Sequence, residues 1–440
     1  MSVLGTDPPP EEEFPVTEAH GMSYPFQATD WINGINMDNL REGRLKRAKT
    51  ELFEKRKFGA FLSLNEWNTR YITSTYTPMW TTSSSGLRYS LLVKGDAQPI
   101  VYEQGDIGYH TERFATWLPK GNVKWAITGM GWIARCMGEP AHAAAVKRFV
   151  DQICIELKRQ GVEKEVLALD FADPAISAAF EAKGVKTSGD GYLALLDARK
   201  HKMPEEVQCL RNTCSVGDAM FEALRQTTRP GVSEHEILGE VFKACYKSGG
   251  EVYSGVFCTS GPYSWPNLRC WTGRRLNPGD VIYMDVYNTS WNGYKTCYYR
   301  TFSLGEPSKA TKEAYQRAYD WLYDSISVIK PGVTSKEIAE KWPSGPKVWA
   351  DIGVVHEDQT AGNNWAHGIG LTLYEPPLVW RGCSLDHPMV IEEDMCFAIE
   401  TQEGDHQGQG VRIEEVLHVT KTGVEILSKW PIKEMTVIDI

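Results

Sequence analysis

The fold is decided by the stretch Gly410-Val-Arg-Ile-Glu-Glu-Val-Leu-His-Val419, an apolar strand pattern that carries Glu414 in its middle. A carboxylate in such a setting is costly to bury unless it is paired or bound to a metal. Three other stretches share this character. They are Gly279-Asp-Val-Ile-Tyr-Met-Asp-Val-Tyr287 with Asp285, Asn364-Trp-Ala-His-Gly-Ile-Gly-Leu371 with His367, and Met395-Cys-Phe-Ala-Ile-Glu400 with Glu400 at its end.

One histidine and three strand-borne carboxylates form a metal-type set by their ligand chemistry. If they cluster, the carboxylates cannot all stay ionised unless something neutralises them, which could be a divalent ion, arginine side chains or protons on a carboxyl group. The ligands of an ion would be His367, Glu400 and Glu414, with Cys297 or Asp285 as the fourth. The arginines would be Arg300 and Arg412. We favour a single metal ion among these three solutions.

The composition excludes several classes of protein. The chain has 440 residues and a mass of 49.5 kDa, which suggests two domains or one large domain with an extension. A net charge of −10 argues against nucleic acid or anionic lipid as the main partner. No apolar run approaches the roughly 20 residues of a membrane span. We expect a cytoplasmic protein whose scattered cysteines are reduced.

The sequence predicts three parts of the chain. Residues 1–36 are expected to form an extended arm, because the start of the chain is proline-rich and acidic. Strand-like runs alternate with helical patterns over residues 37–199, which indicates an α/β domain. The last part, residues 200–440, opens at Met203-Pro-Glu-Glu206, where proline and acidic residues suit the start of a helix.

An internal repeat lies within residues 200–440. The stretch Arg229-Pro-Gly-Val-Ser-Glu-His-Glu-Ile237 recurs as Lys330-Pro-Gly-Val-Thr-Ser-Lys-Glu-Ile338. Each copy combines a turn with a capping box, in which a Ser or Thr is followed three residues later by a Glu. The repeat indicates a duplicated half-domain with pseudo-two-fold symmetry.

Several motifs occur in one order within residues 200–440. They are the Pro-Gly-Asp turn before Asp285, Arg300-Thr301, the run from His367 to Pro377, Ala398-Ile-Glu400, and Gly410-Val-Arg-Ile-Glu414. In these motifs the chain resembles the creatinase, aminopeptidase P and methionine aminopeptidase superfamily. The resemblance implies an α+β fold, with a pita-bread C-terminal domain and a creatinase-like α/β N-terminal domain. The stretch Ser260-Gly-Pro-Tyr-Ser-Trp-Pro266 looks most like the dimethylsulfoniopropionate lyases of this superfamily.

The chain departs from the pattern of this superfamily at its metal site. The two-metal site of the family uses two Asp, one His and two Glu, and these positions correspond here to Asp285, residue 297, His367, Glu400 and Glu414. Residue 297 is a cysteine, so the bridging carboxylate is missing. This loss argues against a paired-metal site of the peptidase type.

Other catalytic positions differ as well. The two auxiliary histidines of the peptidases correspond to Asn267 and Tyr374. A further Asp of the sulfonium lyases corresponds to Tyr287, and the proposed catalytic Asp of those lyases corresponds to Leu373. The chain therefore matches neither set of catalytic residues, and we interpret it as a divergent member of the superfamily.

The preferred functional hypothesis is a non-peptidase lyase. It would act on a small aromatic or onium-type molecule by carboxylate- or metal-assisted proton abstraction, followed by elimination or retro-aldol-type cleavage. The expected catalytic residues are Glu400, Glu414, His367, Tyr287 and Tyr374. The expected substrate-binding residues are Trp265, Trp291, Trp365 and Arg412. The expected metal ligands, if a metal is bound, are Asp285, Cys297, His367, Glu400 and Glu414.

Three alternatives stay open. The first is a creatinase-like C–N hydrolase, the second a metallo-aminopeptidase or prolidase, and the third a binding protein without catalysis. The cofactor is expected to be at most one divalent metal per chain, and a metal-free site is also open. The resemblance further implies a homodimer, in which the segment from Tyr71 to Trp80 would reach across to the partner.

Overall fold

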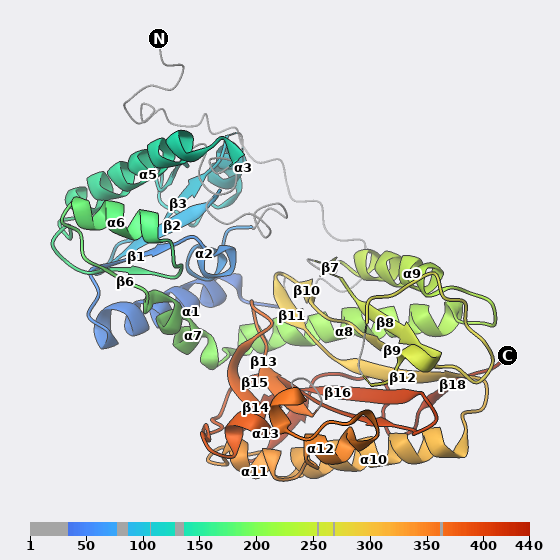
Figure 1. The fold of residues 1–440 in the computed structure, drawn as a ribbon. Coiled ribbons are helices and arrows are strands. Elements are labelled where there is room, and N and C mark those ends of the chain that lie inside the picture. Colours follow the sequence, from blue (N-terminus) through green and yellow to red (C-terminus); the bar gives the residue numbers. More distant parts are fainter. Residues whose placement is uncertain are drawn as a thin grey trace. The chain divides into compact units, whose positions relative to one another are not determined.

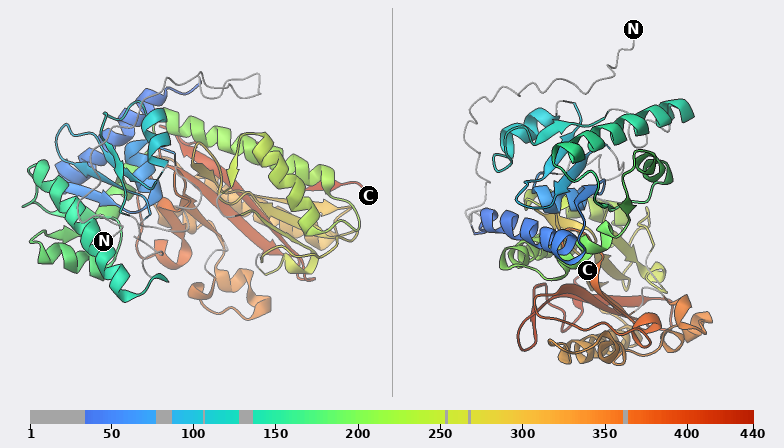
Figure 2. Two further views of the ribbon diagram at one scale, coloured as in Figure 1. Left: turned by 90° about the horizontal axis from the view of Figure 1, so that it is seen from above. Right: turned by 90° about the vertical axis from the view of Figure 1, so that its left-hand side faces the viewer.

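The computed structural model describes residues 34–76, 87–105, 107–127, 136–252, 255–266, 269–360 and 364–440 (Figures 1 and 2). The chain divides into two compact units, Asn36–Arg199 and Lys200–Ile440. The expected arm, residues 1–36, lies almost entirely outside the described residues. Within the described part of the chain, no helix combines the length and the apolar character that crossing a membrane requires.

The first unit is built on a six-stranded sheet with the strand order β4-β3-β2-β1-β5-β6. Strand β1 pairs antiparallel with β2 and parallel with β5. Every residue of β1, β2 and β3 is buried, because apolar side chains alternate onto two covered faces of the sheet. The strands are β1 (Ala60–Ser63), β2 (Tyr89–Val93), β3 (Ile100–Glu103), β4 (Val123–Trp125), β5 (Leu167–Leu169) and β6 (Thr187–Ser188).

Helices surround this sheet. Helix α1 is shorter than the amphipathic pattern from Met37 to Lys57 predicts, and its last turns form the π-helix η1. Helix α5 packs Phe149 and Ile153 into the core of the unit. The helices are α1 (Met37–Lys49), η1 (Thr50–Lys55), α2 (Glu66–Thr73), α3 (Ile107–Phe114), α5 (Glu139–Arg159), α6 (Pro174–Ala182) and α7 (Gly191–Lys200).

Helix α2 is fixed inside the first unit. Its Tyr71 is fully buried, and the hydroxyl group donates to the carbonyl oxygen of Ala198 at 2.8 Å. The start of the segment that was expected to cross to a dimer partner therefore packs within its own unit. Residues 77–80 of that segment lie outside the described residues, so the homodimer stays a prediction.

The second unit places three sheets between helices (Figures 1 and 2). Helices α8 and α9 lie on one side of the strands, and α10 and α11 lie on the other. The helices are α8 (Pro204–Thr227), α9 (Glu234–Lys247), η3 (Gly261–Tyr263), α10 (Lys309–Ser327), α11 (Ser335–Ala339), α12 (Gly345–Val348), η4 (Ala350–Ile352), η5 (Glu357–Gln359) and α13 (Arg381–Ser384). This mixture of helices and sheets confirms the expected α+β class.

The largest sheet of the second unit has the order β14-β13-β15-β16-β17, and it lies beside a four-stranded sheet, β18-β12-β9-β8, and a three-stranded sheet, β11-β10-β7. Alternate side chains of β15 and β16, such as Ile399, Val411 and Ile413, point into the core that α10 covers. The strands are β7 (Glu251–Val252), β8 (Phe257–Ser260), β9 (Val281–Asp285), β10 (Thr289–Trp291), β11 (Tyr294–Thr296), β12 (Tyr299–Leu304), β13 (Trp365–Gly368), β14 (Glu375–Trp380), β15 (Cys396–Gly404), β16 (Gly410–Val419), β17 (Val424–Ile426) and β18 (Thr436–Ile438).

The two copies of the sequence repeat adopt the same local structure. Ser233 caps α9 and Thr334 caps α11, each within a capping box. The turn before each cap makes the same contact, because Gly231 donates its N–H to Leu276 and Gly332 donates its N–H to Ile391, both at 2.8 Å. Each acceptor precedes a core strand, β9 or β15. The repeat is therefore structural, and it supports the interpretation of two related halves.

Replacing Asn65 by alanine should destabilise the first unit. The Asn65 side chain accepts hydrogen bonds from the N–H groups of Trp67 and Asn68, both at 3.0 Å, and so caps α2. Loss of such a cap should lower the free energy of unfolding by about 1 kcal/mol. Denaturant unfolding would measure this change, and Asn65→Ser should restore most of the loss. An Asn65→Ala variant as stable as the wild type would contradict this role.

Candidate functional site

The polar side chains singled out by the sequence meet where β9, β13, β15 and β16 lie side by side. Glu400 on β15 is opposite Glu414 on β16, and Trp365 on β13 is opposite Glu400. Opposite residues of paired strands project from the same face of a sheet. Asp285 stands at the end of β9, opposite Tyr299 on β12. The predicted carboxylates therefore share one buried region, and each is at most 2% exposed.

Glu400 forms a bidentate ion pair with Arg412. The Nη2 atom of Arg412 donates to Oε1 of Glu400 at 2.9 Å, and Nε donates to Oε2 at 3.0 Å. The guanidinium carbon of Arg412 also lies 4.4 Å from the centre of the Tyr299 ring. Both oxygens of Glu400 are thus occupied, although the sequence pattern predicted a metal-ligand or acid–base role for this residue and a substrate-binding role for Arg412.

Arg300 forms its ion pair with a carboxylate outside this cluster. Its Nη2 atom donates to Oε2 of Glu415 at 2.8 Å, and this ion pair is buried. Glu415 is the neighbour of Glu414 and projects from the opposite face of β16, as alternation along a strand requires. Of the two arginines proposed from the sequence, Arg412 is the one paired with a carboxylate of the cluster.

Glu414 is fully buried, and neither of its carboxyl oxygens has a hydrogen-bond partner among the described residues. Burial, followed by the charges of Glu400 and Asp285, raises the pKa of Glu414 well above its ordinary value. A buried carboxyl group with two unpartnered oxygens costs several kilocalories per mole unless a cation or a proton satisfies it. Glu414 is therefore the group of the cluster that most requires a cation or a proton.

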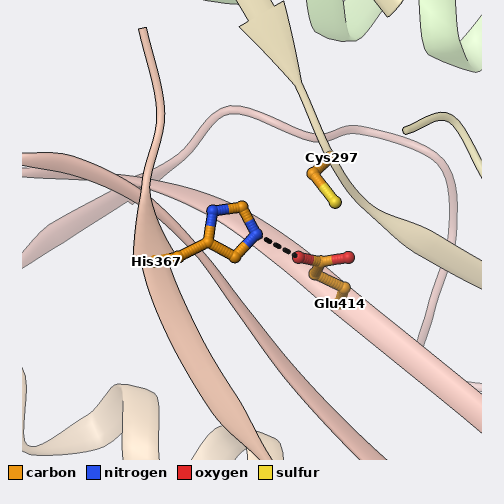
Figure 3. Close-up of side chains that lie close together, drawn as sticks. All are labelled: Cys297, His367 and Glu414. Atoms are coloured by element: carbon orange, nitrogen blue, oxygen red, sulfur yellow. Dashed lines mark ion pairs between the residues drawn. The ribbon is translucent and has the colours of Figure 1, made fainter. Parts of the chain in front are cut away.

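His367 is oriented by its other ring nitrogen. The Nδ1 atom lies 2.8 Å from the carbonyl oxygen of Leu373, and since a carbonyl only accepts, Nδ1 carries the proton. The unprotonated Nε2 atom then lies 3.9 Å from Oε1 of Glu414 (Figure 3). Burial lowers the pKa of His367 to about 4, so the ring is neutral near pH 7. A neutral imidazole held in this way is typical of a metal ligand.

Cys297 lies between β11 and β12, and its side chain points toward His367 and Glu414 (Figure 3). Its Sγ atom is 3.5 Å from each carboxyl oxygen of Asp285, to which the thiol donates. Burial, with Asp285 as the next cause, raises the pKa of the Cys297 thiol well above its ordinary value. Burial, with Glu400 as the next cause, likewise raises the pKa of Asp285. In this arrangement the thiol and the carboxyl group share a hydrogen bond.

Three side chains are close enough to hold one metal ion. One ligand atom from each of Cys297, His367 and Glu414 can be chosen so that all lie within 4.8 Å of one another. Figure 3 shows these side chains converging from three different segments of the chain. The chemistry of the donors and the unpartnered oxygens of Glu414 fit a single divalent cation. Of the expected ligands, Asp285 adjoins this trio through Cys297, and Glu400 is held by Arg412.

Two tyrosines lie beside the trio. Tyr287 and Tyr374 share a hydrogen bond through their side chains, and the Tyr374 ring lies 4.8 Å from that of His367. Burial raises the pKa of both hydroxyl groups, so both stay protonated near pH 7. Tyr374 is 50% exposed and therefore lies at the surface of the cluster. Trp365 packs near it, with ring centres 5.8 Å apart.

The other predicted tryptophans lie elsewhere. Trp265 packs against Gly404 and Gly410 at the far ends of β15 and β16. Trp291 is buried in the three-stranded sheet, on β10. Both positions lie away from the carboxylate cluster, so the expected substrate-binding roles have no support here. Asn267 lies outside the described residues.

Sequence reasoning assigned no role to Tyr299. The pKa of Asp285, which is raised by burial, is lowered in turn by a side-chain hydrogen bond from Tyr299, and the Tyr299 ring also faces Arg412. Residues two apart on a strand project from the same face, so the strand pattern from Tyr299 to Thr301 could have indicated that one face of β12 meets the cluster. The sequence alone does not show which strand pairs with β9.

Comparison with known proteins shows what this geometry resembles. Residues 208–421 match the model of Metallopeptidase family M24. The probable dipeptidase PepE of Mycobacterium tuberculosis is 25% identical over 242 residues, which are 55% of this chain and 62% of that protein. The Xaa-Pro dipeptidase of Lactobacillus helveticus is 27% identical over 246 residues, which are 55% of this chain and 63% of that protein. These matches thus span less than two thirds of either relative.

Solved structures extend the likeness to nearly the whole chain. The Xaa-Pro dipeptidase from Bacillus anthracis superimposes with a TM-score of 0.67 at 21% identity, over 90% of this chain and 99% of that chain. Dipeptidase PepE from Mycobacterium ulcerans gives a TM-score of 0.67 at 20% identity, over 91% of this chain and 98% of that chain. In fold the chain is therefore similar to solved Xaa-Pro dipeptidases. More particularly, the match over residues 208–421 supports metallopeptidase family M24.

The expected lyase function is wrong. The relatives are named dipeptidases and Xaa-Pro dipeptidases, which are hydrolases, and these names also contradict the expected aromatic or onium substrate. The creatinase-like alternative does not match these names best either. The changes at residues 287, 297 and 374 were interpreted as a change of reaction class, whereas the rest of residues 208–421 still resembles the peptidases.

Replacing Arg412 by methionine should destabilise the second unit strongly. The change leaves the buried Glu400 without its partner, and breaking one side of a buried ion pair costs about 3–5 kcal/mol. The double variant Arg412→Met/Glu400→Gln should recover most of the loss because it removes both charges. Arg211→Met is the matched control, since it breaks the partly exposed pair with Glu425 and should cost no more than about 1 kcal/mol. Equal losses for both single variants in denaturant unfolding would show that burial adds nothing to the Arg412–Glu400 pair.

Proposed function

We propose that this chain hydrolyses an amide bond in a small, dipeptide-sized substrate, assisted by one divalent metal ion. The observation that carries the proposal is the buried trio Cys297, His367 and Glu414, in which Glu414 has two carboxyl oxygens without a partner among the described residues. The named activities of the relatives, dipeptidase and Xaa-Pro dipeptidase, supply the reaction class. As the finer fold assignment, we propose a pita-bread C-terminal domain preceded by a creatinase-like domain.

The charges of the cluster favour a divalent ion. Asp285, Glu400 and Glu414 are all buried, and Arg412 is paired with Glu400. Among the described side chains, Asp285 and Glu414 are then left without an ion-pair partner that carries a fixed positive charge. One divalent cation would neutralise ionised Glu414 and one further negative charge, that of Asp285 or of the Cys297 thiolate.

The residues that would hold the ion are His367, Glu414 and Cys297. When bound, such an ion acts as a Lewis acid on the scissile carbonyl group and lowers the pKa of a bound water. Three protein ligands leave a coordination position open, as hydrolytic metal sites require. Glu400 contributes indirectly, because its ion pair with Arg412 compensates one negative charge of the cluster.

The remaining polar groups have roles that follow from their positions. Burial raises the pKa of Asp285, so its carboxyl group can take a proton from an attacking water. Tyr374 and Tyr287 present protonated hydroxyl groups beside His367. A hydroxyl group there can donate to the oxygen of the tetrahedral intermediate or to the leaving nitrogen. Burial of the other groups excludes bulk water from the reacting atoms.

Glu414→Gln should abolish dipeptide hydrolysis while leaving the fold intact. Glutamine keeps the size of the side chain but removes the negative charge that binds a cation, so kcat/KM should fall by at least about 100-fold. Release of free amino acids from a panel of dipeptides, including Xaa-Pro substrates, would measure the change. Glu425→Gln, on β17, is the matched control and should turn over like the wild type.

Removal of metal provides the second arm of the same test. Exhaustive chelation of the wild-type protein should abolish hydrolysis, and one equivalent of a divalent ion should restore it. Full activity of a metal-free protein would overturn the metal-assisted mechanism. A metal-loaded wild type that releases no amino acid from any member of the panel would overturn the proposed reaction.

Tyr374→Phe should lower kcat by about 100-fold with little change in KM. Phenylalanine keeps the ring that packs beside His367 and Trp365, and it removes only the hydroxyl group that donates in the transition state. Steady-state kinetics on a cleaved dipeptide would separate the two parameters. A similar fall for Tyr287→Phe would indicate that the hydrogen-bonded pair donates as a unit. If both variants turn over like the wild type, the tyrosines serve packing alone.

A further inference from the structure

We infer that the cation site is selective for a thiophilic divalent ion of the zinc type, because Cys297 supplies one of its three ligands. This inference deepens the proposed function, since it names the ion that the same site would hold. It rests on the identity and placement of three side chains, not on the reaction that they assist.

The softness of the sulfur ligand determines which ion the site prefers. A site built from carboxylates and one imidazole suits Mn²⁺ and other ions that prefer oxygen. Thiolate, imidazole and carboxylate together are the three ligand types that zinc accepts in proteins. Cys297 is 5% exposed and His367 and Glu414 are 1% and 0% exposed, so the thiolate would coordinate in a dry environment where its preference for soft ions has full effect.

The geometry allows coordination with a small movement. Four-coordinate zinc with bond lengths near 2.1 Å brings nitrogen and oxygen ligand atoms to about 3.4 Å from each other. In the structure, Nε2 of His367 and Oε1 of Glu414 are 3.9 Å apart. A side-chain shift of a few tenths of an ångström would therefore close the site on an ion, and the sulfur lies within the same small volume.

The imidazole is already held in the orientation that a ligand needs. The carbonyl of Leu373, which accepts from Nδ1 of His367, belongs to a loop anchored by Glu375. The carboxylate of Glu375 accepts from the N–H of Thr372 at 3.1 Å and pairs with Lys202 at 2.8 Å in a fully buried ion pair. Such outer contacts fix the tautomer and direction of a metal-binding histidine. Their presence beside a cysteine points to a preformed site rather than to a chance thiol.

Cobalt titration of the chelated full-length protein tests this inference. One equivalent of Co²⁺ should bind and produce the near-ultraviolet charge-transfer absorption of a thiolate–cobalt bond. Zn²⁺ should displace the cobalt, and Mn²⁺ should bind weaker than Zn²⁺ by at least about 100-fold. Cys297→Ser should lose the absorption, whereas Cys258→Ala, which changes another fully buried cysteine on β8, should keep it.

Cys297→Asp adds an independent arm. An oxygen ligand in place of sulfur should abolish the absorption and reduce the preference for Zn²⁺ over Mn²⁺ by at least about tenfold. Absence of the absorption in the wild type, or its persistence in Cys297→Ser, would overturn the inference without requiring either variant to be active. Dipeptide hydrolysis without the absorption would overturn the thiolate site and leave the proposed function standing. The absorption without hydrolysis would support the thiolate site and overturn the proposed function.

Discussion

The site depends on one electrostatic constraint, which is that three carboxyl groups are buried together and one guanidinium group pairs with one of them. Arg412 binds Glu400 through two hydrogen bonds, and this pairing leaves Asp285 and Glu414 to be neutralised in another way. Neighbouring polar groups reduce the electrostatic cost of burying these carboxyl groups. The thiol of Cys297 donates to Asp285, Tyr299 donates to the same carboxyl group, and His367 stays neutral because it is buried.

The repeated turn-and-cap structure before β9 and β15 helps to explain how this cluster forms from distant parts of the sequence. Equivalent turns before α9 and α11 anchor equivalent strands, β9 and β15, through the same backbone contacts. One half then contributes Asp285 and Cys297, and the other contributes His367, Glu400 and Glu414. A site assembled from both halves is enclosed by the core of each, which accounts for the depth at which its charges are buried.

Much of this arrangement could be predicted from the sequence, since local patterns specified it. Apolar runs that hold a single carboxylate identified β9, β15 and β16, and the repeated capping boxes identified the starts of α9 and α11. The sequence could not show which side chains contact each other, because these contacts depend on strand pairing and rotamers rather than on spacing. Hence the sequence left both a substrate-binding and a charge-compensating role open for Arg412, and it did not show that Arg412 pairs with Glu400 or that Tyr299 faces Arg412. The reaction class was predicted wrongly because missing family residues were weighed more heavily than the retained fold.

Cys297 has a place in the chain that sets it apart from the other residues of the trio. His367 and Glu414 lie within paired strands, where a change of side chain also disturbs cross-strand packing, whereas Cys297 lies in the short connection between β11 and β12. A change at position 297 would therefore break no cross-strand pair, although the side chain is buried beside Asp285. A fold with one such variable coordinating position can diversify its inorganic chemistry through single substitutions, while the scaffold that holds the remaining groups is inherited unchanged.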